Sequence, residues 1–102
     1  MEVHNFDDSV EEFIKSLEEQ TIAKVLRTTE LLEEYGPQLV MPHSRKIENN
    51  LFELRIRGQQ EIRIFYTFHK SSAILLHGFV KKSEKTPKKE IKTALQRLKA
   101  LD

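Results

Sequence analysis

The stretch that decides the fold is residues 51–87, LFELRIRGQQEIRIFYTFHKSSAILLHGFVKKSEKTP. Three runs in it alternate apolar and polar side chains, at residues 51–57, 61–68 and 73–81. Alternation with a period of two is typical of β-strands, because successive side chains point to opposite faces of a sheet. Short turns separate the runs, and Gly58 can take the positive φ that a tight hairpin needs. We therefore expect three antiparallel strands.

The two faces of this expected sheet differ in character. Even positions give an apolar face, which we expect to be the core side: Phe52, Leu54, Ile56, Ile62, Ile64, Tyr66, Phe68, Ile74, Leu76 and Val80. Odd positions give a mixed face: Glu53, Arg55, Arg57, Glu61, Arg63, Phe65, Leu75, His77, Phe79 and Lys81. Three arginines beside aromatic side chains form a surface where an anion could bind.

Two amphipathic segments precede this stretch. Ser9 and Glu12 match a capping box, and the apolar spacing that follows predicts a helix over residues 9–18. A second stripe begins at Ile22 and stops at Gly36 and Pro37, which are typical of a helix end. We expect the two helices to form a hairpin over the even face of the strands, because both stripes need an apolar surface to cover.

The segments around these helices are less regular. Residues 1–6 are either a first edge strand or a lead-in to the first helix. Residues 37–50 show no period and contain two prolines and two asparagines. We expect an ordered connection there, carrying Arg45 and Lys46.

A basic helix is expected near the C-terminus. Thr86 and Pro87 are a typical N-cap and first-turn pair. The apolar stripe of this helix consists of Ile91, Ala94, Leu95 and Leu98. It either covers Phe65, Leu75 and Phe79 of the odd face or is left for a partner protein. Together the elements predict one α+β domain over residues 1–102: a helical hairpin on an antiparallel sheet of three to four strands, followed by a basic helix.

Composition excludes several classes of chemistry. A chain of 102 residues forms one domain with a single core. Without cysteine it has no disulfide, thiolate metal site or cysteine nucleophile. The sequence also lacks histidine and carboxylate spacings typical of metal ligands, a glycine-rich phosphate loop and a serine-nucleophile elbow. We expect neither a metal nor a cofactor.

The chain also lacks membrane and export signals. No apolar run approaches the roughly 20 residues that a membrane span needs, and the acidic N-terminus does not match a signal peptide. We expect a soluble cytoplasmic protein that has no membrane partner.

Charge is distributed unevenly along the chain. Residues 1–34 contain ten acidic and three basic residues, a net charge of −7. Residues 35–102 contain fourteen basic and six acidic residues, a net charge of +8. This asymmetry favours a polyanionic partner for the C-terminal two-thirds. The alternative is that acidic and basic side chains merely solvate opposite sides of the molecule.

The basic side chains that we expect to converge are compatible with RNA cleavage. They are Arg55, Arg57, Arg63, Lys81, Lys82 and Lys85. When RNA is cut by its own 2′-hydroxyl, that hydroxyl loses a proton, the phosphorane gains charge and the 5′-oxygen is protonated. Arginine suits the charge stabilisation, because its fork is planar, bidentate and permanently charged. For the same reason arginine is a poor base.

The general base is open on composition alone. A lysine would need a crowded cationic site to lower its pKa. Glu53, Glu61 and His77 are alternatives, and we expect both glutamates to form salt bridges with neighbouring arginines instead. Phe65 or Phe79 either stacks on an RNA base or belongs to the core under the last helix.

The sequence resembles the RelE/ParE superfamily of bacterial toxins, and within it the HigB-like, phage-associated branch. Five segments carry the resemblance in the family's order: FIKSLEEQTIAKVLRTTELLEEYG at residues 13–36, ELRIR at 53–57, RIFYTF at 63–68, ILLHGFVKKSEKTP at 74–87, and the basic helix after it. Each segment alone is a weak signal, but their order over nearly the whole chain is specific.

The resemblance implies a RelE-like fold, in which two helices pack on a curved antiparallel sheet. It also implies the toxin of a type II toxin–antitoxin system, an mRNA interferase that cuts messenger RNA in the ribosomal A site without a metal. Such toxins are neutralised by a cognate antitoxin, in the HigB-like branch commonly a helix-turn-helix protein of the HigA type.

Site residues follow from the resemblance position by position. Arg55, Arg63, Lys81 and Lys82 match the family's basic catalytic positions. We expect the RNA-binding residues to be Arg57, Lys46, Lys85, Lys88 and Phe79. Two features depart from RelE: Glu53 stands where a lysine is expected, and no tyrosine follows the KKSEKTP loop.

Two other functions are compatible with the same fold. One is a ParE-like inhibitor of DNA gyrase that does not cut nucleic acid, which the basic cluster disfavours. The other is a nucleic-acid-binding module without catalysis, which would bind RNA with strong salt dependence and leave it intact.

Overall fold

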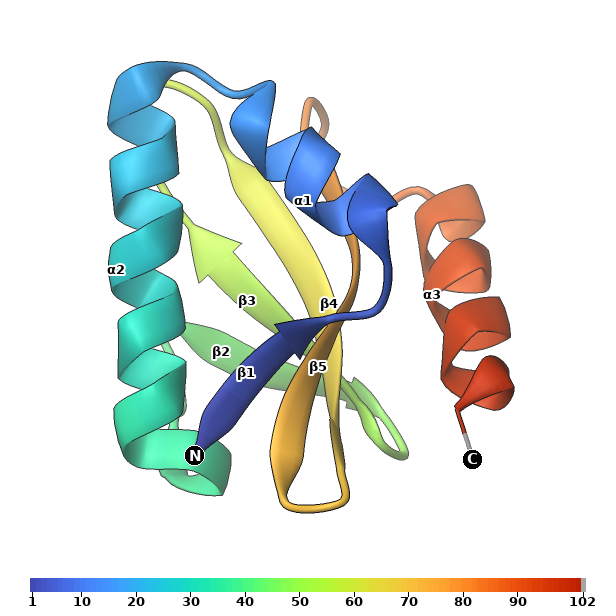
Figure 1. The fold of residues 1–102 in the computed structure, drawn as a ribbon. Coiled ribbons are helices and arrows are strands. Elements are labelled where there is room, and N and C mark those ends of the chain that lie inside the picture. Colours follow the sequence, from blue (N-terminus) through green and yellow to red (C-terminus); the bar gives the residue numbers. More distant parts are fainter. Residues whose placement is uncertain (102) are drawn as a thin grey trace.

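The computed structural model describes residues 1–101, which form three α-helices and a five-stranded mixed sheet (Figure 1). The elements in chain order are β1 (Glu2–Asn5), α1 (Asp8–Lys15), α2 (Glu19–Tyr35), a 3₁₀ turn (Gly36–Gln38), β2 (Ser44–Glu48), β3 (Leu51–Ile56), β4 (Ile62–His69), β5 (Ser72–Val80) and α3 (Lys88–Ala100). The strand order is β1-β5-β4-β3-β2. The α+β prediction is confirmed, whereas the predicted strand count of three to four is too low.

The two edge strands account for the difference. β1 runs parallel to β5, with Val3 opposite Ala73, so residues 1–6 contain an edge strand and the sheet is not purely antiparallel. β2 lies antiparallel to β3, with Ser44 opposite Leu54. The ordered connection expected over residues 37–50 therefore contains a strand, β2, that was not predicted. Ser44 is buried because its hydroxyl and the hydroxyl of Tyr66 share a 2.6 Å hydrogen bond.

The two N-terminal helices begin at different residues from those predicted. Asp7 caps α1, because its carboxylate accepts a 2.9 Å hydrogen bond from the backbone N–H of Ser9. The predicted capping box at Ser9 is therefore wrong. The second helix begins at Glu19, three residues before the predicted stripe. It ends at Gly36, whose φ of 52° fits a helix end as expected.

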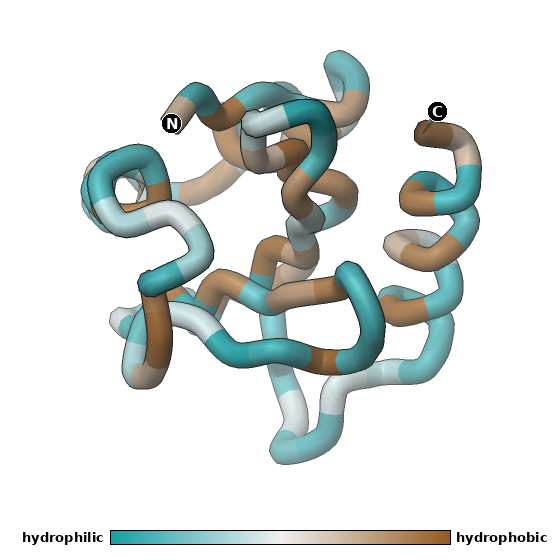
Figure 2. The backbone as a smooth tube through the Cα atoms, turned by 90° about the horizontal axis from the view of Figure 1, so that it is seen from below, coloured by the Kyte–Doolittle hydropathy of each residue, from teal (hydrophilic) through white to brown (hydrophobic). Residues whose placement is uncertain are grey.

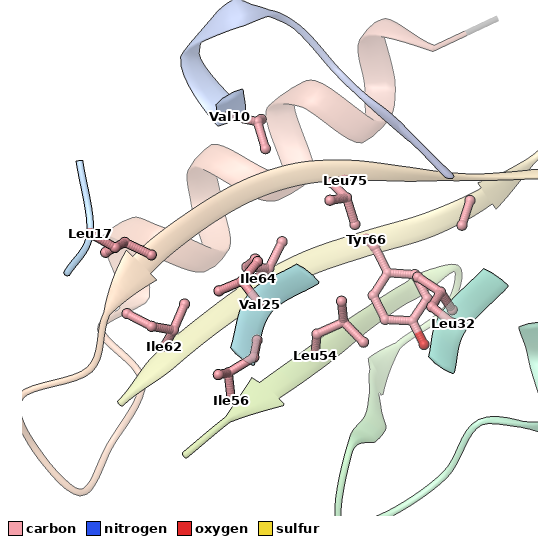
Figure 3. Close-up of a cluster of buried hydrophobic side chains, with 11 residues drawn as sticks. Val10, Leu17, Val25, Leu32, Leu54, Ile56, Ile62, Ile64, Tyr66 and Leu75 are labelled. Carbon is pink, nitrogen blue, oxygen red and sulfur yellow. The ribbon is translucent and has the colours of Figure 1, made fainter. Parts of the chain in front are cut away.

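The main core lies between the helical hairpin and one face of the sheet (Figure 3). Val10 of α1 and Val25 and Leu32 of α2 contribute from the helices, and all three are at most 1% exposed. Leu54 and Ile64 are fully buried on the sheet side. The expectation that the even positions of β3 and β4 face the hairpin is confirmed.

A β-bulge in β5 reverses the expected faces of that strand. Phe65 lies opposite His77, but Tyr66 lies opposite Leu75, so Leu76 is the extra residue. Before the bulge, odd positions such as Leu75 therefore face the helical hairpin. Ile74 and Leu76 lie in the cluster on the other face, and the prediction for these three residues is wrong.

A second cluster fills the space between α3 and the other face of the sheet. Phe65, Leu76 and Phe79 pack there with Ala94 of α3. The rings of Phe65 and Phe79 are stacked, with centroids 5.7 Å apart. Figure 2 shows the hydrophobic positions of α3 on the side that faces the rest of the molecule. The helix therefore covers Phe65 and Phe79, as one of the two alternatives predicted, but does not cover Leu75.

Candidate anion-binding site

The register of the sheet brings the predicted cationic residues to one end of it. Arg55 near the end of β3 lies directly opposite Arg63 near the start of β4. The backbone N–H of Lys81 donates a 2.7 Å hydrogen bond to the carbonyl of Glu61, which places the residue after β5 at the same end. Like charges that face each other across two strands repel, so this end of the sheet requires compensating negative charge.

Glu53 supplies part of that negative charge from inside the protein. Its side chain is completely buried, and one carboxylate oxygen lies 3.1 Å from Nε of Arg45 and 3.6 Å from Nε of Arg63. Nη2 of Arg63 also donates a 3.1 Å hydrogen bond to Glu61. The expectation that both glutamates pair with arginines is confirmed.

Arg63 is inside this network rather than on the surface. Its side chain is 2% exposed, so in this structure it has almost no area from which to contact RNA. The predicted direct contact with a phosphate therefore does not fit the geometry of Arg63. The contacts of this arginine assign it to positioning Glu53 and Glu61.

Several polar atoms of the network lack hydrogen bonds. Within residues 1–101, the buried atoms without a hydrogen-bond partner are Glu53 Oε2, Arg55 Nε, Arg63 Nε and Arg63 Nη1. The 3.6 Å separation between Glu53 and Arg63 is an ion pair but is too long for a hydrogen bond. Unsatisfied buried groups of this kind are costly, and three of the four atoms are arginine nitrogens.

Arg55 is partly exposed, and its guanidinium lies near three other arginines. Burial lowers the pKa of Arg55, and the positive charges of Arg63, Arg45 and Arg57 lower it further, against the single opposing influence of Glu53. The side chain remains charged, because an arginine pKa starts far above neutrality. The four guanidinium groups of Arg45, Arg55, Arg57 and Arg63 outnumber the two carboxylates of Glu53 and Glu61, which leaves an excess of positive charge at this end of the sheet.

A cleft with a volume of about 250 Å³ lies beside Arg55. Its lining residues are Lys24, Arg27, Thr28 and Leu31 of α2, Pro42 and His43 of the loop before β2, and Arg55, Ile56 and Arg57. The sequence reasoning identified Arg55 and Arg57 but missed Lys24 and Arg27. A signal was present, since these two residues lie three positions apart in an otherwise acidic helical segment and so share one face.

Lys24 is held over the turn between β3 and β4. Its ammonium donates a 3.3 Å hydrogen bond to the carbonyl of Arg57. A Cβ atom at Gly58 would lie 2.5 Å from that nitrogen, so the glycine makes room for the lysine. Within the described chain Gly36 is the one glycine with a positive φ, and the positive φ predicted for Gly58 is wrong.

The lysines predicted from the sequence are distributed over several surfaces. The ammonium of Lys81 donates to the carbonyl of Glu84, which folds the loop after β5 back on itself. Lys82, Lys85 and Lys88 are exposed in that loop and at the start of α3. Lys46 lies opposite Phe52, whose side chain packs in the core under the hairpin, so it does not join the arginine cluster on the other face.

The predicted base-stacking role of Phe79 does not fit the structure. This side chain is 5% exposed and packs in the cluster under α3. His77, one of the candidate bases, shares a 2.8 Å hydrogen bond with Glu90 of α3, and both side chains are 19% exposed. Phe79 and His77 therefore attach α3 to the sheet.

The described residues contain neither a metal-binding cluster nor a membrane-spanning helix. Among residues 1–101, no three His, Asp or Glu side chains lie close enough together to hold a metal ion. Of the three helices described, none is both long and apolar enough to cross a membrane.

The architecture is that of a small α+β domain with an arginine cluster at one end of its sheet, which is consistent with a toxin fold. Residues 12–99 match the model of the family described as phage derived protein Gp49-like (DUF891). The chain belongs to this family, which is related to RelE- and HigB-type toxins. A search of curated proteins gave no match. The relationship to RelE-type toxins is therefore confirmed, and the HigB-like branch stays a prediction.

Proposed function

We propose that this protein is the toxin of a type II toxin–antitoxin system of the HigB-like branch and acts as a ribosome-dependent, metal-independent mRNA endoribonuclease. The observation that carries the proposal is the position of Arg55, which is partly exposed, lies among three other arginines and has no salt bridge of its own within residues 1–101. Membership of the Gp49-like family supports a toxin-like module.

In this proposal the arginines have two different roles. Arg55 and Arg57 contact the scissile phosphate and stabilise the charge that develops on the phosphorane, because a guanidinium donates two parallel hydrogen bonds to phosphate oxygens. Arg63 supports them from below by holding Glu53 and Glu61. Lys81, Lys82 and Lys85 bind neighbouring phosphates from the loop after β5.

Proton transfer is the step for which the geometry narrows the candidates. Glu53 is buried between two arginines, Glu61 pairs with Arg63, and His77 bonds to Glu90. A carboxylate or imidazole that is already engaged with a partner is less available to take the 2′-hydroxyl proton. Of the predicted catalytic residues, Lys81 and Lys82 remain for proton transfer, and we propose that an ammonium there donates its proton to the 5′-oxygen as that oxygen leaves.

Mapping of cut sites on a message tests the proposal. Purified protein is added to a translating extract that contains the message. In parallel it is added to the same message without ribosomes. The 5′ ends of the products are mapped by primer extension. We expect cuts in register with the reading frame and dependent on ribosomes. Cleavage of the naked message alone would contradict ribosome dependence, and an intact message would contradict nuclease activity.

Arg55→Ala is the decisive variant. Loss of one charge-stabilising donor typically costs about 10²–10³ in rate. The matched control is Lys92→Ala, which removes an exposed positive charge from α3, outside the cluster and cleft. If a folded Arg55→Ala protein cuts the message as fast as the control, the assignment of Arg55 is wrong.

The partner proposed for this toxin is a cognate antitoxin of the helix-turn-helix, HigA-like type. The adjacent gene is the place to look for it. Co-expression should restore growth, and the two proteins should purify as a complex. If the purified protein instead blocks supercoiling by purified gyrase and leaves messages intact, the ParE-like alternative is correct.

A further inference from the structure

We propose that the cleft between α2 and β3 binds one nucleotide of a single-stranded RNA, with its phosphate at the basic rim and its base on the apolar lining. The polymeric nature of the ligand rests on the proposed function. The binding chemistry rests on the cleft itself, whose residues from α2 belong to no predicted site.

The basic rim comes from two elements that face each other. Lys24 and Arg27 lie three residues apart on α2, so they share one side of that helix. Arg55 belongs to β3, and Arg57 follows directly after the end of this strand. In the described part of the chain, the lining includes four such cations and no Asp or Glu. A rim of this composition attracts an anion.

Arginine makes phosphate the best match for that rim. Its fork donates two parallel hydrogen bonds to a phosphate, and Arg55 is partly exposed and has no salt bridge within residues 1–101. Nη1 of Arg55 contacts the sulfur of Met41 at 3.2 Å, which is a weak acceptor that a phosphate oxygen would outcompete.

The apolar lining makes a nucleotide a better match than free phosphate. Leu31, Pro42 and Ile56 contribute aliphatic surface on which a planar base can pack. The wall at Pro42 is fixed relative to β3, because the backbone N–H of Arg55 donates a 2.9 Å hydrogen bond to the carbonyl of His43.

The size of the cleft limits its ligand to one nucleotide. Its volume of about 250 Å³ is just below the ~300–1,000 Å³ of typical small-molecule pockets. An acidic peptide would meet the same positive rim, but its carboxylates would leave the apolar lining without a planar group. We therefore favour RNA over an acidic peptide.

Binding of a six-nucleotide, 2′-O-methylated RNA, followed by amide NMR, tests this inference without requiring cleavage. We expect the largest shifts at Arg27, Leu31 and Ile56. An abasic oligomer with the same number of phosphates should bind at least about fivefold more weakly, because burial of roughly 40 Å² of base surface at about 25 cal/mol per Å² gives that factor. Equal affinity for the two oligomers would overturn the role of the apolar lining.

Two variants separate the cleft from general electrostatics. Arg27→Ala should weaken RNA binding and reduce the slope of log affinity against log salt by about one. Lys92→Ala is the control with the same charge change on α3, and it should leave the shifts at the cleft residues unchanged. The same loss of cleft shifts in both variants would overturn the inference.

A variant of the apolar lining and a peptide competitor complete the test. Leu31→Ala should weaken binding of the RNA but leave binding of the abasic oligomer unchanged. Displacement of the RNA by hexaglutamate at an equal concentration would assign the cleft to an acidic peptide and overturn the inference. Selective RNA binding by a protein that cuts no message would refute the proposed nuclease activity and leave the nucleotide cleft standing.

Discussion

Replacing Glu53 with glutamine should destabilise the fold by about 3 kcal/mol. Glu53 is completely buried, and its carboxylate lies between Arg45 and Arg63. Removing one partner of a buried ion pair typically costs about 3–5 kcal/mol, because the other charge is left uncompensated in a poorly solvated site. We place this variant at the lower end, since Glu61 still pairs with Arg63 at 3.1 Å.

Arg45→Ala is the matched control for this prediction. It removes the other partner of the same Arg45–Glu53 pair, but the Arg45 side chain is 50% exposed. Arg63 remains beside Glu53 at 3.6 Å in this variant, and water screens the exposed end of the Arg45 pair, so the loss should be about 1 kcal/mol. The pair thus predicts a marked asymmetry: loss of the buried acid should cost at least three times as much as loss of the exposed base.

Urea unfolding followed by circular dichroism measures both variants. The free energy of unfolding of a small domain is about 5–15 kcal/mol, so Glu53→Gln should stay folded in water and unfold at a lower urea concentration with an unchanged slope. A second change, Arg63→Met, should recover part of the loss, because it removes the uncompensated charge. The reasoning is refuted if Glu53→Gln costs less than about 1 kcal/mol or no more than Arg45→Ala.

Two further changes test the backbone geometry. Lys70 and Ser71 take positive φ values of 49° and 66° in the turn between β4 and β5, so Ser71→Gly should raise the free energy of unfolding by about 0.5–1 kcal/mol, whereas Ser72→Gly within the strand should lower it. Thermal unfolding of these two variants measures the opposite shifts. Gly78→Ala should cost about 1–3 kcal/mol in urea unfolding, because a Cβ atom there would lie 2.6 Å from the ring of Phe13 on α1. Replacing that ring with a smaller side chain in Phe13→Leu should reduce the loss of unfolding free energy caused by Gly78→Ala. Additive effects of the two changes would contradict the steric explanation.

The sequence predicted the bounds of β3, β4 and β5 to within one residue, because these apolar-rich runs are separated by clear turn residues. It did not predict β2, whose segment SRKIE contains a single partly buried apolar residue. The buried member of that strand is Ser44, which is held by a hydrogen bond to Tyr66 rather than by hydrophobicity. The pattern of β1 is similarly weak, since Val3 is its one partly buried residue and the other three are exposed.

The bulge in β5 could not be predicted from alternation. Ile74, Leu75 and Leu76 are three consecutive apolar residues, so either register buries apolar side chains on both faces. Parity specifies a face only where polar residues separate the apolar ones. The consequence extends to the site, because the bulge sets which side of β5 carries His77 and Phe79 toward α3.

Charge balance explains why the sequence located the arginine cluster but not the roles within it. Alternation placed Arg55, Arg57 and Arg63 together, yet it gave no information on which of them a carboxylate would neutralise. Glu53 and Glu61 both pair with Arg63, and among residues 1–101 no salt bridge involves Arg55 or Arg57. Of the four arginines in the cluster, the two without a carboxylate partner, Arg55 and Arg57, are also the two that line the cleft. A phosphate at the cleft would therefore supply the negative charge that Arg55 and Arg57 do not receive from a carboxylate. For this reason removal of Arg55, rather than of Arg63, should abolish function while the ion pairs of Glu53 and Glu61 stay in place.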